Sequence, residues 1–170
     1  VRQEHSVVLL AGMGPDILCH AVPSGQLLQR MPVMPDGVRV HGISHCLAEE
    51  QGHSSRAAIA AVYGDRYIQV MLLQPPGSRS EIISSVFRLP RVLRGWVLDV
   101  QLQALPSTGG SAEWLLVAGI SDNSVDVWRL NRSAKSDTGD SQAHCWSATC
   151  LHSKRCAERC LLYSMALHLP

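Results

Sequence analysis

The chain has 170 residues, of which 46% are apolar and 17% charged, so it can form a folded core and does not read as disordered. Its net charge of +1 gives no reason to expect nucleic acid, a membrane or an acidic partner, and no apolar run approaches the roughly 20 residues of a membrane helix. Because Val1-Arg-Gln-Glu-His lacks a signal-peptide layout, we expect a soluble, cytoplasmic protein.

The first predicted elements are two strands joined by a glycine turn. Residues 6–11 form an apolar run that leads through Gly12-Met-Gly14-Pro-Asp16 into a second apolar run at 17–22. Gly12-Met-Gly14 after a strand is also the start of a dinucleotide-binding loop, but residue 17 is Ile where the third glycine is required. We therefore assign Gly14 to a tight turn and expect no bound cofactor.

A second strand pair has the same layout. The apolar run of residues 57–62 is followed by Gly64 and Asp65 and then by a second apolar run that ends at Leu73. We assign Gly64 and Asp65 to the turn between the two strands.

The third pair is the most informative stretch of the chain. Residues 114–120 lead through Asp122 and Asn123 into a run in which apolar and polar side chains alternate, the period of two of a strand. Asp and Asn tolerate left-handed backbone and hydrogen-bond locally, so a hairpin closes there with little strain. Trp128 in the second strand suits a wedge between neighbouring sheets.

Further strand-like runs lie between and after these pairs, separated by polar or Pro/Gly-rich loops. The runs are residues 26–33, 38–47, 81–89, 96–105, 143–152 and 160–168. Together with the three pairs they give about twelve strands, which predicts an all-β fold.

The three pairs are equivalent, since Met71 and His20 occupy the position of Trp128 in their own pairs. The repeat is longer than the roughly 40–45 residues of a compact WD40 repeat, and the excess falls in the loops. Because a blade has four strands and propellers close with typically 4–8 blades, we predict a WD40-type β-propeller, of which this chain supplies about three blades of an incomplete ring. The predicted blade portions are about 1–37, 38–90 and 91–152, with the start of the next blade at 153–170.

An incomplete ring exposes strand edges and apolar sheet faces, so we expect the chain to behave poorly in isolation. The chain also lacks an initiator Met and stops in mid-pattern, which leads us to expect a fragment of a longer protein that supplies the remaining blades.

Four short motifs resemble the amino-terminal end of the WD repeat-containing protein six family, in order and in rough spacing. They are Leu10-Ala-Gly-Met-Gly-Pro-Asp16-Ile-Leu, Val40-His41-Gly42-Ile43, Gly95-Trp96-Val-Leu-Asp99 and Arg159-Cys160-Leu-Leu-Tyr-Ser164. The resemblance spans nearly the whole chain. It implies a large multi-propeller protein, the non-catalytic partner of an FtsJ-type methyltransferase that methylates the 2′-oxygen of the tRNA wobble nucleotide. The partner enzyme would bind the methyl donor.

The blade pattern taken alone fits a second function, a WD-repeat protein–protein interaction adaptor in trafficking or signalling. The hypothesis of an enzyme is the least favoured, because the sequence shows no clear pattern of a catalytic nucleophile and base, of paired carboxylates or of a cofactor-binding loop. We assign His41 and Asp99 to hydrogen bonds within the scaffold.

A cysteine and histidine cluster leaves one alternative open. It consists of His144, Cys145, Cys150, His152, Cys156 and Cys160. Thiolates and imidazoles at close spacing can bind zinc, but these intervals differ from the usual Cys-x2-Cys pair. We favour reduced cysteines that act as small apolar side chains over a metal site.

Arg88, Arg91 and Arg94 form a basic run beside Phe87 and Trp96. Three arginines next to aromatic rings can hold a phosphate backbone, which a tRNA-guiding surface needs. The competing interpretation is a solvated connection between blades, because three charges are few against the roughly six to ten phosphate contacts of a strong binder.

Overall fold

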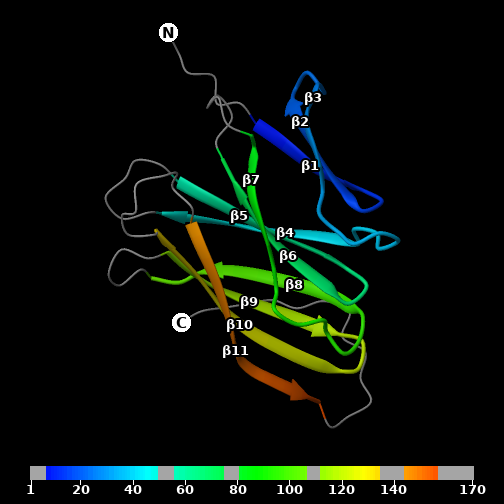
Figure 1. The fold of residues 1–170 in the computed structure, drawn as a ribbon, viewed down its shortest axis with the longest axis vertical. Helices are drawn as coiled ribbons and strands as arrows, with labels where there is room; N and C mark the ends of the chain where they lie inside the picture. Colours follow the sequence, from blue (N-terminus) through cyan, green and yellow to red (C-terminus); the bar gives the residue numbers. More distant parts are fainter. Residues whose placement is uncertain (1–6, 50–55, 75–80, 107–111, 135–143, 157–170) are drawn as a thin grey trace.

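A computed structural model describes residues 7–49, 56–74, 81–106, 112–134 and 144–156. They form eleven β-strands and no helix, so the all-β prediction is confirmed, and none of them belongs to a helix that could cross a membrane. The strands build three antiparallel sheets that follow one another in chain order (Figure 1). The strand expected at residues 160–168 lies outside the described part of the chain.

Each sheet is made of strands that are consecutive in the sequence. The first sheet contains β1 (Val7–Met13), β2 (Asp16–Val22) and β3 (Leu27–Pro32). The second contains β4 (Gly42–Glu49), β5 (Arg56–Gly64), β6 (Tyr67–Leu73) and β7 (Ile83–Arg88). The third contains β8 (Val97–Ala104), β9 (Ala112–Ile120), β10 (Ser124–Ala134) and β11 (His144–Arg155). The second and third sheets have four strands each, the number predicted for a blade, and the described residues give three in the first, which match the three strand-like runs predicted within residues 1–37.

The central hairpin of each sheet closes at the turn residues identified from the sequence. Gly14, Asp65 and Asn123 all have positive φ, at 59°, 47° and 63°. Glycine, aspartate and asparagine adopt this left-handed conformation more readily than other residues. Gly64 serves a different purpose, since its φ is ordinary but a Cβ atom there would overlap the carbonyl oxygen of Arg39.

The hairpin register makes the three sheets directly comparable. The pairs that close the hairpins are Met13 with Asp16, Gly64 with Tyr67, and Ile120 with Ser124. Counted from these pairs, His20, Met71 and Trp128 are each the fifth residue of β2, β6 and β10. Met71 and Trp128 are buried, whereas His20 is partly exposed.

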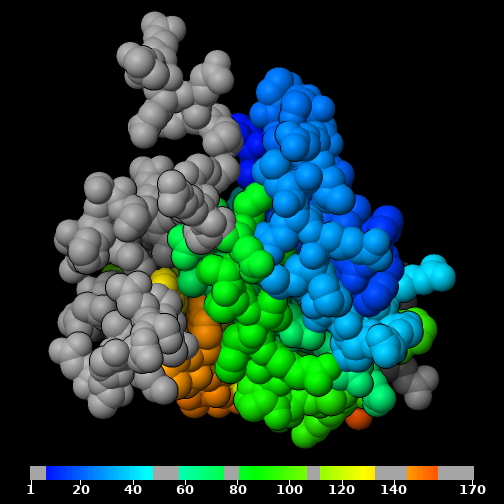
Figure 2. All heavy atoms as spheres, turned by 45° about the horizontal axis from the view of Figure 1, so that its top comes forward, coloured from blue at the N-terminus to red at the C-terminus, as the bar shows by residue number. Residues whose placement is uncertain are grey.

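Two apolar layers hold the sheets together. Between the first and second sheets, Ile17 and Cys19 of β2 pack with Val62 of β5 and Met71 of β6. Directly paired residues of an antiparallel ladder share a face, so the Met71 face of the second sheet is turned toward the first sheet. Figure 2 shows the first sheet in blue against green residues of the second.

The layer between the second and third sheets repeats this arrangement one sheet further along. Ile68 and Val70 of β6, which are the counterparts of Ile17 and Cys19, pack with Trp128 and Leu130 of β10. Trp128 is in turn the counterpart of Met71. The face of the second sheet that packs on the third sheet is therefore equivalent to the face of the first sheet that packs on the second.

This stacking leaves the outer sheets with one apolar face each. In the middle sheet, β6 is buried over five consecutive residues, because both of its faces are covered. The first sheet exposes Val7 and Leu9, at 57% and 56%, on the face away from the second sheet. On the outer face of the third sheet, Val125 and Val127 are only partly buried.

Candidate binding surface

The segment that connects the second and third sheets is fixed to the turn between β5 and β6. The Leu93 N–H donates to the carbonyl oxygen of Arg66 at 3.1 Å, and the Val97 N–H donates to that of Asp65 at 2.6 Å. These bonds use backbone atoms only, so the side chain of Arg66 is left exposed.

The same segment is fixed to the turn between β9 and β10. The Trp96 N–H donates to Ser121 Oγ at 2.9 Å, and the Ser121 N–H donates back to the Trp96 carbonyl oxygen at 2.8 Å. Gly95 permits this approach, since a Cβ atom there would lie 2.7 Å from Ser121 Oγ. The backbone of Trp96 is thus held while its side chain is 64% exposed.

These segments surround a hollow of ≈ 540 Å³, which we call the rim hollow. It is lined by Val38, Asp65, Arg66, Tyr67, Arg94, Gly95, Trp96 and Ser121. The guanidinium groups of Arg66 and Arg94 make no ion pair with any residue in the described ranges. The carboxylate of Asp65 has a cationic neighbour when His41 is protonated, because His41 Nε2 lies 3.7 Å from its Oδ1.

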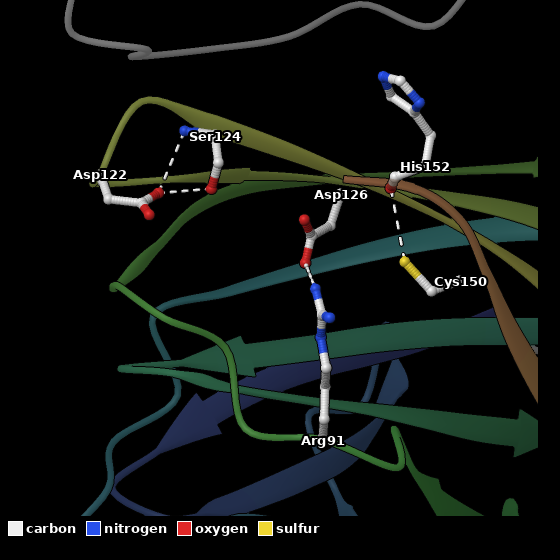
Figure 3. Close-up of polar contacts among 6 residues, drawn as sticks. All are labelled: Arg91, Asp122, Ser124, Asp126, Cys150 and His152. Carbon is white, nitrogen blue, oxygen red and sulfur yellow. Dashed lines mark hydrogen bonds and ion pairs between the residues drawn. The ribbon is translucent and has the colours of Figure 1, made fainter. Parts of the chain in front are cut away.

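The structure separates Arg94 from Arg88 and Arg91, the other two arginines predicted as RNA contacts, which line a smaller hollow of ≈ 190 Å³. Arg91 donates to the carboxylate of Asp126 at 2.7 Å (Figure 3). Its guanidinium also lies 5.3 Å from the centre of the Trp128 ring. Arg88 stacks over the ring of Tyr67 at 5.0 Å. Only Arg94 of the three lines the rim hollow.

Sequence reasoning missed Arg66, which joins Arg94 in the hollow from a different strand pair. A signal was present, because Arg66 directly follows the turn residue Asp65 and turn residues point to solvent. What the sequence did not reveal is that the turn at Asp65 lies beside Trp96.

Asp122 and Asn123 act as turn residues, as the sequence predicted for their place in the hairpin. Asp122 Oδ1 accepts a hydrogen bond from the Ser124 N–H at 3.1 Å and another from the Ser124 hydroxyl (Figure 3). Asn123 supplies the left-handed residue of the loop.

A second hollow of ≈ 560 Å³, which we call the edge groove, lies between the first and second sheets. It is lined by Val8, Leu9, Leu10, Ile43, His45, Leu47, Ala58, Leu73, Gln74 and Ile82. The strand β1 forms its wall and is the edge of the first sheet, whereas β5 and β9, its counterparts, each pair with one more strand. Among the described residues, the groove therefore lies beside a strand edge of the kind that β4 and β8 cover in the other two sheets.

The cysteine and histidine cluster is spread along β11. Cys145 and Cys156 are exposed free thiols at opposite ends of this segment, and the Cys150 thiol donates to the backbone carbonyl of His152 at 3.5 Å (Figure 3). Within the described ranges no three potential ligands lie close enough together to hold a metal ion. Cys160 lies outside those ranges.

His41 and Asp99 are both engaged within the scaffold. Besides its contact with Asp65, His41 donates its backbone N–H to the Tyr63 carbonyl oxygen at 2.8 Å. The Asp99 carboxylate accepts a hydrogen bond from the Val100 N–H at 2.9 Å.

Three groups in the sheets have altered acidity. Burial raises the pKa of the Cys19 thiol, and burial also raises the pKa of the Cys46 thiol against a smaller lowering by a backbone hydrogen bond from Ala104. Burial, and then the charge of Asp99, raises the pKa of the Tyr63 hydroxyl. All three shifts stabilise the neutral form at neutral pH, so none of them prepares a nucleophile.

No known family model matches the sequence, and a search of curated proteins gives no match either.

Proposed function

We propose that the three sheets are blades of a WD40-type β-propeller, and that the protein is the non-catalytic auxiliary subunit of an FtsJ-type tRNA 2′-O-methyltransferase. The observation that carries the propeller proposal is the repeated facing relation between the sheets. Met71 and Trp128 are each the fifth residue of the third strand in their sheet. In both interfaces this residue is turned toward the preceding sheet.

A contact between two unlike faces, repeated with the same orientation, either closes into a ring or continues as an open array. The outer face of the first sheet, which carries Val7 and Leu9, is equivalent to the Met71 face of the second sheet and the Trp128 face of the third. The outer face of the third sheet, which carries Val125 and Val127, is equivalent to the opposite face of the second sheet, that of Ile68 and Val70. We propose that the remaining blades of a longer protein cover both faces and supply the strand that fills the edge groove.

Three of the four motifs that resemble the WD repeat-containing protein six family meet at one end of the sheets. The Val40 N–H donates to the carbonyl oxygen of Gly14 at 2.8 Å, which joins the first motif to the second. His41 of the second motif and Val97 of the third both contact Asp65. The fourth motif, residues 159–164, lies outside the described ranges. Convergence of separate motifs on one rim supports the proposal that they mark a partner surface.

The chemistry of the described surface also supports a scaffold. The titratable groups in the rim hollow and the scaffold residues His41 and Asp99 form no nucleophile and base pair, and the buried thiols are held neutral. In this proposal the catalytic groups and the methyl donor belong to the partner enzyme, and the complex acts in the cytoplasm.

The test is the amount of 2′-O-methyl at the tRNA wobble nucleotide, measured by mass spectrometry in source cells. We expect the mark to be lost when the parent gene is deleted and restored when the gene is returned. An unchanged mark would overturn the proposal and leave the WD-repeat adaptor in trafficking or signalling, whose partners co-purification would then identify.

A further inference from the structure

The rim hollow has a rigid frame. Four hydrogen bonds fix the backbone of the segment 93–97: two to backbone carbonyl groups of the β5–β6 turn, one to the backbone N–H of Ser121 and one to the Ser121 hydroxyl. Leu93 is buried, and Gly95 is packed against Ser121 and Ile120. A side chain carried by this segment is therefore presented in a fixed place, which lowers the entropic cost of binding a ligand.

The frame presents the positive charges of two arginines, against one carboxylate, that of Asp65, in the lining of the hollow. Arg66 and Arg94 enter the hollow from different segments, and neither has an ion-pair partner within the described ranges. By contrast, Arg30 and Arg91 are each paired with a buried carboxylate, at 2.5 Å and 2.7 Å. The guanidinium group is planar and always charged, and it binds phosphate oxygens through several N–H donors.

The frame also presents an aromatic face. Trp96 is 64% exposed, whereas Trp114 and Trp128 are buried in the layer between the second and third sheets. Trp146 stacks on Phe87 and packs against Trp114, so it is also engaged. An exposed indole ring on a fixed backbone is available to stack on a planar group of a ligand.

We propose that the rim hollow binds a nucleotide of single-stranded nucleic acid, with the phosphate held by Arg66 and Arg94 and the base stacked on Trp96. Proteins that bind single strands combine a cationic surface for the backbone with aromatic rings for the bases. An acidic peptide without aromatic residues would use the arginines but has no ring to stack on the indole. The inference rests on the proposed function and extends it, because the tRNA substrate of such a subunit contains unpaired nucleotides that the subunit can bind.

The test is the binding of a fluorescein-labelled oligouridylate to the purified protein, followed by fluorescence polarisation over a range of salt concentrations. We expect Trp96→Ala to weaken binding about tenfold or more, and Trp96→Phe to retain most of the affinity, because any aromatic ring can stack on a base. Arg66→Glu and Arg94→Glu are each expected to weaken binding and to reduce the slope of log affinity against log salt by about 0.7 per lost phosphate contact.

Arg129→Glu is the matched control, because Arg129 is an exposed arginine of β10 that does not line the hollow. It makes the same change in net charge and is expected to have a much smaller effect. Equal weakening by Arg129→Glu and Arg94→Glu would overturn the inference, as would full affinity in Trp96→Ala. Competition by polyglutamate as effective as that by unlabelled oligouridylate would overturn it in favour of an acidic peptide site.

The outcome is separable from that of the proposed function. Oligonucleotide binding reports on the hollow alone, whereas the wobble methylation of cells without the parent gene reports on the subunit role alone. Loss of the mark on gene deletion with no oligonucleotide binding would leave the role standing and reject the hollow.

Discussion

The guanidinium of Arg91 and the carboxylate of Asp126 lie 2.7 Å apart although 35 residues separate them in the chain. Asp126 belongs to β10 of the third sheet and is 1% exposed, whereas Arg91 lies in the segment that leaves the second sheet. The pair therefore ties the connecting segment to the sheet that follows it. The same guanidinium lies over the Trp128 ring, so charge and packing act at one point.

Arg91→Ala is expected to lower the free energy of unfolding by about 2 kcal/mol, between the values for exposed and for buried pairs, because the Arg91 side chain is 40% exposed. The loss arises because the Asp126 carboxylate is left buried without its partner. The double variant Arg91→Met/Asp126→Leu should recover much of the stability, and urea denaturation measures both. Equal stability of Arg91→Ala and the unmodified protein would show that the pair contributes nothing.

Gly64→Ala is expected to destabilise the fold strongly, because the added Cβ atom meets the backbone carbonyl of Arg39, which has no flexible end to move away. Gly14→Ala should cost only about 1–2 kcal/mol, the strain of a left-handed residue, since nothing lies within 4 Å of the added atom. The comparison of their denaturation midpoints separates steric overlap from backbone strain. A larger loss for Gly14→Ala would contradict the prediction.

Stability should fall at alkaline pH. The pKa values of Cys19 and Cys46 are raised above 9.0, and that of Tyr63 above 10.0, chiefly by burial. Below about pH 9 these groups are neutral in both states, and above it they ionise first in the unfolded chain, so the free energy of unfolding drops as pH rises through the raised values. Denaturation midpoints at neutral and alkaline pH measure the drop, which Cys19→Val should reduce and Cys145→Ser should leave unchanged.

Leu9→Lys is expected to reduce self-association of the chain in sedimentation velocity. Leu9 is exposed on the outer face of the first sheet and borders the edge groove, so a lysine there opposes pairing of β1 with another chain. Val86→Lys is the control, because Val86 is an exposed apolar residue of the second sheet that does not line the groove. If both substitutions change the sedimentation profile equally, the edge is not the site of association.

Much of the local structure could be predicted from the sequence, because it depends on neighbours along the chain. The alternation of β10 and the turn residues Gly14, Asp65 and Asn123 were identified correctly, since strand period and left-handed backbone are local properties. The equivalence of Met71 and Trp128 also followed from spacing alone, and both are buried as expected of core positions.

The contacts between distant segments could not be predicted in the same way. Nothing in the sequence indicated that Arg91 reaches Asp126, while its neighbour Arg94 faces a hollow that Arg66 also lines. The spacing of three arginines suggested one group, but a connecting segment that crosses between sheets turns successive side chains toward different surroundings.

The repeated facing relation between the sheets also bears on how such a chain can change in evolution. A segment duplicated from β4 to the residues before β8 would fold into a sheet whose two faces already match its neighbours. Lengthening the protein by one unit then requires no new interface, only a copying error in the gene that keeps the reading frame. Deletion of a unit is equally simple, so related genes should differ by whole sheets more readily than by single strands.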